Sequence, residues 1–157
     1  MALPTDAAEV RAVTVRDPDV VALIEALDSD LAGAGYRESE SFGYSTHELE
    51  TASVHLVGAS VGGRLVGIGG IELQGGGFAE LKRFYVAPDH RGNGFADAIL
   101  DALERYARDH GVDVLRLETG DRQDAAISFY RKRGFQAIPR FGPYVDSKAS
   151  VCMQHDL

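Results

Sequence analysis

Cysteine is nearly absent from this sequence, since Cys152 is the only one among 157 residues. A disulfide within the chain and a metal site built from cysteines are therefore excluded. A single thiol is typical of proteins in a reducing compartment, so we expect a cytoplasmic location. The five histidines are scattered, and none forms the i, i+4 pair of a helical zinc site, so we expect no metal.

Apolar runs of membrane length and an excess of basic residues are absent as well. No apolar run reaches the roughly 20 residues that span a bilayer, and MALPTDAAEV lacks the basic flank and apolar stretch of a signal peptide. The 16 basic and 24 acidic residues give a net charge of −8. This charge argues against nucleic acid and anionic membrane surfaces as partners. This charge favours a cationic small molecule as the partner, although many acidic proteins carry such a charge only because it keeps them in solution.

The composition is that of an ordinary globular protein, with 45% apolar and 25% charged residues. A chain of this length is about one domain and can bury a core without disulfides. Because it contains no internal repeat, low-complexity tract or linker, we expect residues 1–157 to form a single domain.

Hydrophobic periodicity predicts strands and helices in the order β-α-loop-β-β-β-α-β-α-β-β. Helices are expected at residues 17–35, 94–110 and 124–133, where apolar residues recur at helical spacing. Strands are expected at residues 10–15, 54–60, 64–73, 78–86, 112–119, 135–138 and 151–155. The polar segment 36–51 is expected to be a loop with room for a short helix.

The turns between these segments predict an α+β fold with a mixed sheet. Gly62-Gly63 is a hairpin signal and QGGG ends the following strand, so the three central strands form an antiparallel meander. A helix connects the last of these strands to residues 112–119, which predicts that those two strands are parallel.

Local signals mark the helix ends. Asp17 is a suitable N-cap, with Pro18 at the first helical position. Gly111 is expected to end the second helix. Gly134 is expected to end the third, with Phe135 placed for the apolar contact of a Schellman motif.

The segment YVAPDHRGNGFADAIL places an arginine and two glycines at the start of a predicted helix. Most strand-to-helix turns of this kind bind nothing. A dinucleotide fingerprint is a second interpretation, since Gly92 and Gly94 have its spacing and Glu118 stands where a ribose-binding acid belongs. However, Asp97 occupies the position of the third glycine.

The third interpretation is a cradle for the pyrophosphate of an acyl-CoA. A helix N-terminus offers unpaired N–H groups and a partial positive charge. Glycines let the backbone approach a phosphate closely, and Arg91 adds a permanent charge. Every residue type in the turn has a role in this interpretation.

Two motifs support the third interpretation through a resemblance to a known family. Arg91-x-x-Gly94-x-Ala96, preceded by AELKRFYVAP, is similar to the R/Q-x-x-G-x-G/A motif of the GNAT superfamily of acyl-CoA-dependent N-acetyltransferases. About 35 residues later, AAISFYRKRGF resembles the family signature A-x-x-x-Y-x-x-x-GF at Ala126, Tyr130, Gly134 and Phe135. The order of elements also fits, over nearly the whole chain. The ending FGPYVDSKASVCMQ is similar to a subgroup of small bacterial members whose substrates are mostly unassigned.

The resemblance implies an α/β/α sandwich with a splayed parallel strand pair that admits the pantetheine arm of acetyl-CoA. The backbone of Phe84, Tyr85 and Val86 would line that arm, and an N–H there would polarise the thioester carbonyl. This apolar run is compatible with a β-bulge, or with a strand buried on both faces. Gln123 stands where many members have an asparagine that bonds the pantetheine, so this contact is in question. The pyrophosphate would be held by Arg91, Gly92, Asn93, Gly94, Phe95 and Ala96.

The resemblance also implies catalytic residues. Tyr130 would donate a proton to the departing thiolate, although the pattern alone favours a core tyrosine. Glu80 is the candidate general base, with an exposed glutamate paired to Lys82 or Arg83 as the alternative. Two acidic residues, Asp121 and Glu118, are weaker candidates.

The implied activity is direct transfer of an acetyl group from acetyl-CoA to a primary amine of a small molecule or peptide. A non-catalytic acyl-CoA sensor on the same fold is the alternative. The acceptor walls are expected at residues 36–47 and in the FGPY loop with Phe141 and Tyr144. Three acids near the first wall would attract a cationic amine or form a solvated loop: Glu38, Glu40 and Glu48. A homodimer through the late strands is consistent with this fold.

Overall fold

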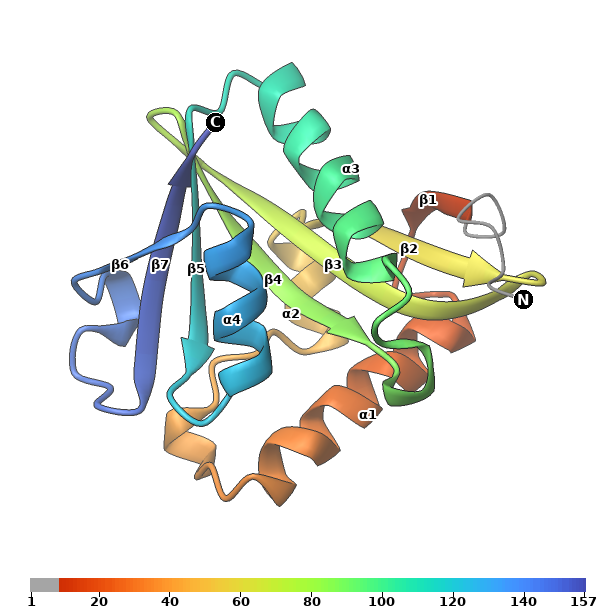
Figure 1. Cartoon of the computed structure of the whole chain (residues 1–157), viewed down its shortest axis with the longest axis horizontal. Coiled ribbons are helices and arrows are strands. Elements are labelled where there is room, and N and C mark those ends of the chain that lie inside the picture. Colours follow the sequence, from red (N-terminus) through yellow and green to blue (C-terminus); the bar gives the residue numbers. More distant parts are fainter. Residues whose placement is uncertain (1–8) are drawn as a thin grey trace.

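The computed structural model describes residues 9–157, which form a seven-stranded sheet in the order β1-β2-β3-β4-β5-β7-β6 (Figure 1). Neighbouring strands are antiparallel except β4 and β5, which are parallel. The strands are β1 (Glu9–Val13), β2 (His55–Val61), β3 (Arg64–Gly75), β4 (Phe78–Val86), β5 (Val114–Gly120), β6 (Gln136–Ile138) and β7 (Ser150–Asp156).

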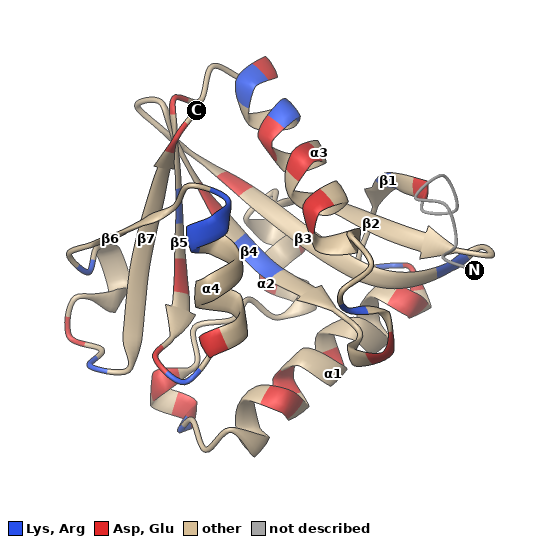
Figure 2. Ribbon diagram, in the orientation of Figure 1, with Lys and Arg blue, Asp and Glu red and all other residues tan. Residues whose placement is uncertain are grey.

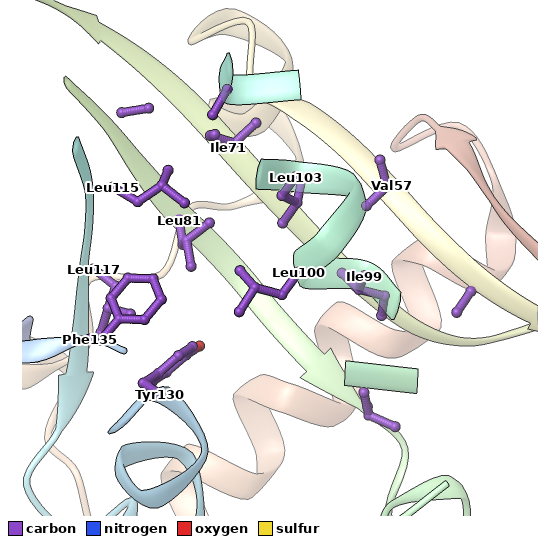
Figure 3. Packing of buried hydrophobic residues seen from close by; sticks show 14 of the residues in the cluster. Val57, Ile71, Leu81, Ile99, Leu100, Leu103, Leu115, Leu117, Tyr130 and Phe135 are labelled. Carbon is purple, nitrogen blue, oxygen red and sulfur yellow. The ribbon is translucent and has the colours of Figure 1, made fainter. Parts of the chain in front are cut away.

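Helices cover both faces of the sheet. They are α1 (Pro18–Gly33), α2 (Thr46–Thr51), α3 (Phe95–Asp109) and α4 (Asp124–Lys132), with short 3-10 turns at Glu38–Glu40, Pro88–His90 and Gly142–Tyr144. Side chains of α3 and α4 pack into one core (Figure 3), and those of α1 and α2 into another on the opposite face. The predicted α/β/α sandwich with a mixed, mostly antiparallel sheet is therefore confirmed.

The helix ends follow the predicted capping signals. The Asp17 carboxylate accepts a hydrogen bond from the backbone N–H of Asp19, and Pro18 opens α1. At the end of α4, the N–H of Phe135 donates to the carbonyl of Tyr130, and Gly134 has a φ of 94°. This is the Schellman geometry that the sequence predicts. Strand β4 has the predicted bounds, and most other predicted ends shift by one or two residues.

A β-bulge interrupts β4 in the middle of the sheet. Ile68 pairs with Tyr85 but Gly70 pairs with Lys82, so β4 has one extra residue at this point. Arg83 lies in the bulge with a φ of 55°, a conformation that is uncommon for residues other than glycine. In a regular strand, neighbouring side chains point to opposite faces. The bulge, one of the two alternatives left open for this strand, instead places Lys82 and Arg83 on the same face.

Strands β4 and β5 pair over three residues and then separate. The pairs are Phe78 with Val114, Ala79 with Leu115 and Glu80 with Arg116. From Leu81 onward, the edge of β4 that faces β5 has no strand partner among residues 9–157. The sheet is therefore splayed at this point, as the family resemblance implied. No helix within residues 9–157 is both long and apolar enough to cross a membrane.

Candidate active site

The first of two joined cavities runs along the splayed half of β4 and has a volume of about 500 Å³. Its walls come from α1, β4, the turn before α3, and α4. Of the predicted donor-site residues, it brings together Phe84, Tyr85, Val86, Arg91, Gly92, Gly94, Phe95, Ala96 and Gln123. The sequence predictions therefore converge on one groove, which we call the donor groove.

One end of the donor groove is the N-terminus of α3. Gly94 is the N-cap residue with a φ of 83°, and no side chain caps the helix. In the part of the chain that the structure describes, the N–H groups of residues 92–97 donate no hydrogen bond. Such groups, together with the partial positive charge of the helix end, fit a phosphate. The chemistry of this end thus fits the pyrophosphate of a CoA.

The basic and amide side chains of the turn are held by the protein itself. Arg91 donates from Nε to the carbonyl of Val86 at 2.9 Å, and its Nη2 lies 3.7 Å from Asp30 Oδ2. Asn93 donates to the carbonyl of His90 at 3.4 Å and does not line the groove. Arg91 is therefore the charged side chain of the turn that faces the groove.

Tyr130 lies where the donor groove meets the second cavity, and it lines both. Its ring is buried against Phe84, Phe129 and Phe135, with centroids 5.5 to 6.0 Å away. Its hydroxyl makes no hydrogen bond within residues 9–157, and burial raises the pKa of the phenol. The ring therefore belongs to the core, as one interpretation of this tyrosine expected, and the catalytic role of its hydroxyl stays a prediction. Gln123 also lines both cavities.

The second cavity has a volume of about 150 Å³, and we call it the acceptor pocket. The two predicted walls meet here, since the rings of Phe42 and Tyr144 lie edge to face with centroids 5.0 Å apart. Phe141 packs behind Tyr144 at 5.3 Å and does not line the pocket. Of the three acids predicted near the first wall, Glu40 lines the pocket, whereas Glu38 and Glu48 do not.

Glu80 is buried beneath the acceptor pocket rather than exposed in it. Its side chain is 2% exposed and does not line either cavity. Lys82 Nζ lies 2.5 Å from Oε2, and the Tyr144 hydroxyl donates to the same oxygen at 3.0 Å. The pairing with Lys82 was one of the expected alternatives, but the pair lies in the interior.

Glu118 is the acidic residue of β5 that lines the acceptor pocket. The hydroxyl of Ser150 donates to its Oε2 at 2.5 Å. Burial raises the pKa of this carboxyl, and the nearby Glu80 raises it further. Asp121 lies farther out, where its Oδ1 is 3.5 Å from the hydroxyl of Tyr36.

Sequence reasoning did not predict that two basic residues, Lys82 and Arg83, line the acceptor pocket. The side chain of Arg83 is 3% exposed, with Nη2 2.5 Å from Asp28 Oδ1 and with Nε unpaired within the described residues. The ammonium of Lys82 lies 4.2 Å from the centre of the Tyr44 ring. Acidic positions are spread along α1 and α3 (Figure 2), whereas this segment of β4 is basic. The available signal was two adjacent cations inside an apolar strand.

Comparisons with known proteins agree with this geometry. The sequence profile described as the Acetyltransferase (GNAT) family matches residues 20–135. An IAA acetyltransferase of Azospirillum brasilense is 36% identical over 139 residues, covering 88% of this chain and 90% of that protein. A structure from Klebsiella pneumoniae described as an acyl-CoA N-acyltransferase is 33% identical, with a TM-score of 0.80 over 96% of this chain and 97% of the other. The PaiA N-acetyltransferase of Thermoplasma acidophilum, solved with coenzyme A, shares the fold with a TM-score of 0.77 at 22% identity, over 96% and 99% of the two chains.

The chain therefore belongs to the GNAT family of acetyltransferases. It is an N-acetyltransferase whose co-substrate is acetyl-CoA.

Proposed function

We propose that the chain transfers the acetyl group of acetyl-CoA directly to a primary amine of a small molecule or peptide bound in the acceptor pocket. In this proposal, Tyr130 is the proton donor to the departing sulfur and Glu80 is the general base. Acetyl-CoA supplies the acetyl group as a thioester. The dependence on acetyl-CoA and the single cysteine support a cytoplasmic location.

The observation that carries the proposal is the position of Tyr130 at the junction of the donor groove and the acceptor pocket. A group that protonates the leaving sulfur must face the donor and must hold its proton until the acetyl group has moved. A phenol of ordinary pKa, about 10, carries its proton at neutral pH, and burial raises the pKa of Tyr130 further. Its hydroxyl has no protein partner within residues 9–157, so it is free to donate to a bound group.

The splay of the sheet supports the proposed path of the donor. The edge of β4 without a strand partner begins at Leu81 and extends to Val86. Its last three residues, Phe84 to Val86, line the donor groove. Backbone groups at such an edge are available to a ligand, because no strand uses them. The α3 N-terminus lies at the end of the same groove and would hold the pyrophosphate through the N–H groups of residues 92–97.

The acceptor pocket supports a primary amine as the acceptor. Its aromatic walls include Tyr36, Phe42, Tyr44 and Tyr144, and its acidic lining residues are Glu40 and Glu118. Lys82 and Arg83 also line the pocket, but each is paired with a carboxylate outside it, Glu80 and Asp28. The remaining carboxylates beside aromatic rings favour a cationic group. A volume of about 150 Å³ suits a small amine or the end of a peptide rather than a bulky group.

A panel of amines tests the proposal. Polyamines, amino acids, aminoglycosides and short peptides would each be incubated with acetyl-CoA, and products detected by mass. We expect at least one amine to gain an acetyl group only when the enzyme is present. The alternative, a non-catalytic acyl-CoA sensor, predicts a rise in melting temperature with acetyl-CoA but no turnover across the panel.

A further inference from the structure

Two side chains that line the acceptor pocket close off the carboxylate of Glu80. Lys82 Nζ and the Tyr144 hydroxyl both contact Oε2, at 2.5 and 3.0 Å. Within residues 9–157, no other side chain hydrogen-bonds or pairs with Glu80. A proton that leaves an amine in the pocket therefore reaches Glu80 through Lys82 or Tyr144.

Of these two groups, Tyr144 alone has the capacity to pass a proton on. The ammonium of Lys82 has three donors and no acceptor. A phenol has one proton and two lone pairs. The proton of Tyr144 is donated to Glu80, and Lys82 Nζ, 3.2 Å away, occupies one lone pair. The second lone pair is left for the N–H of an amine in the pocket.

We propose that Tyr144 relays the proton of the acceptor amine to Glu80, an inference that rests on the proposed roles of the pocket and of Glu80. As the amine nitrogen bonds to the acetyl carbon, its N–H bond breaks and the proton moves to Tyr144 Oη. The original hydroxyl proton of Tyr144 moves to Glu80 Oε2. The phenol ends neutral and Glu80 ends protonated.

The environment of Tyr144 requires these two transfers to be coupled. Burial raises the pKa of its phenol, and the Glu80 carboxylate raises it further, so an isolated phenolate is disfavoured. The ring makes edge-to-face contacts with the rings of Phe42 and Phe141. These ring contacts and the hydrogen bond to Glu80 fix the orientation of this pocket-lining residue.

Other charged groups around the relay come from two elements, β3 and β5. Glu72 on β3 accepts from the Tyr44 hydroxyl at 3.1 Å, and Arg116 on β5 is the strand partner of Glu80. Glu118 on β5 lines the pocket and holds a hydrogen bond from Ser150. Because Glu118 faces the pocket directly, it is the competing proton acceptor.

The test compares three variants, Tyr144→Phe, Glu80→Gln and Glu118→Gln, on the panel amine with the highest turnover. We expect Tyr144→Phe and Glu80→Gln each to lower kcat by about 100-fold or more. The double variant should be no slower than either single one, because both groups act in one path. In mixtures of H2O and D2O, the wild-type rate should depend on deuterium content with the curvature of two moving protons, whereas Tyr144→Phe should give a straight line.

The controls separate folding from catalysis. Tyr106→Phe removes a phenol that lines neither cavity and should leave kcat unchanged. Melting temperature and CoA affinity show whether each variant is folded. Glu80→Gln leaves Lys82 without its partner and can disturb the fold, but the isotope measurement uses only the wild type and Tyr144→Phe.

Each alternative outcome would overturn a specific part of the proposal. If Glu80→Gln is slow but Tyr144→Phe is not, Glu80 acts without the relay. If Glu118→Gln alone is slow, Glu118 is the base and both the relay and the role of Glu80 are wrong. If no amine is acetylated by the wild-type enzyme, the proposed function fails and the relay fails with it.

Discussion

The guanidinium of Arg83 occupies the space that a side chain at Gly43 would need. A Cβ placed at Gly43 would lie 2.8 Å from Arg83 Cζ and closer still to Nη1. This contact joins the bulge of β4 to the first wall of the acceptor pocket, because both residues line it.

Gly43→Ala is therefore expected to displace Arg83 and distort the acceptor pocket. We expect a loss of about 1–3 kcal/mol in the free energy of unfolding, as for other overpacked sites, and a higher KM for the acceptor. Denaturant unfolding and steady-state kinetics measure the two effects. Gly33→Ala is the matched control, because a Cβ there meets nothing within 4 Å and the residue is helical. If both variants had the same free energy of unfolding and the same KM for the acceptor, the contact between Gly43 and Arg83 would have no role in shaping the pocket.

Gly94→Ala is expected to weaken CoA binding at the start of α3. Gly94 has a φ of 83°, which costs an alanine about 1–2 kcal/mol, and the added methyl group would shift the N–H groups of the cradle. Gly111 ends the same helix with a φ of 73° and has open space around it. Gly111→Ala should therefore lose similar stability but bind CoA normally. Calorimetric titration with CoA and denaturant unfolding distinguish the two, and a normal CoA affinity in Gly94→Ala would rule out the cradle.

Tyr130→Phe is expected to lower kcat by about 100-fold or more while leaving the affinity for CoA unchanged. The phenyl ring keeps the contacts with Phe84, Phe129 and Phe135, so the melting temperature should change little. Single-turnover acetylation of the best panel amine measures the chemical step directly. Full turnover in this variant would show that Tyr130 is a core residue without a catalytic role.

Stability is expected to depend on pH through His55. Its ring stacks on Tyr106 with centroids 3.9 Å apart, and burial, aided by the nearby His110, lowers the pKa of His55. The folded state therefore resists protonation more than the unfolded state does. Folding stability should fall as the pH drops below about 6.5, the ordinary pKa of histidine.

The measurement is the free energy of unfolding at several pH values for the wild type and His55→Gln. At pH 8 the free energies of unfolding of the two proteins should differ only by the contribution of packing the His55 ring. Towards pH 5.5 the difference should shrink, because the wild type loses the stability that depends on a neutral His55. A constant difference across this range would contradict the assignment.

Local sequence signals predicted the elements and the donor groove well. Caps such as Asp17, the Schellman ending at Gly134 and the glycines of the turn before α3 act through neighbouring residues, so they are visible in the sequence. The family motifs then placed Tyr130 and the turn at one groove. The roles of Tyr130 and Glu80 themselves stay predictions.

The acceptor pocket was less predictable because its contacts join distant segments. Tyr144 and Glu80 are 64 positions apart, and no local pattern indicates that they meet. Arg83 reaches the pocket through a positive φ at a residue other than glycine, which carries no sequence signature. Regular alternation would have placed it on the face opposite Lys82.

The short pairing between β4 and β5 has a mechanical consequence. Three residue pairs join these strands, whereas seven join β5 to β7, so the sheet consists of two stiff halves with a weak seam. A donor lying in the groove would contact β4 on one side and α4, which follows β5, on the other, and would thereby strengthen that seam. Amide hydrogens of β5 should then exchange more slowly in the CoA complex than in the free protein, while those of β2 should change little. During turnover, the molecule would thus alternate between a free state with a weak seam and a donor-bound state with a stronger one, both with the same fold.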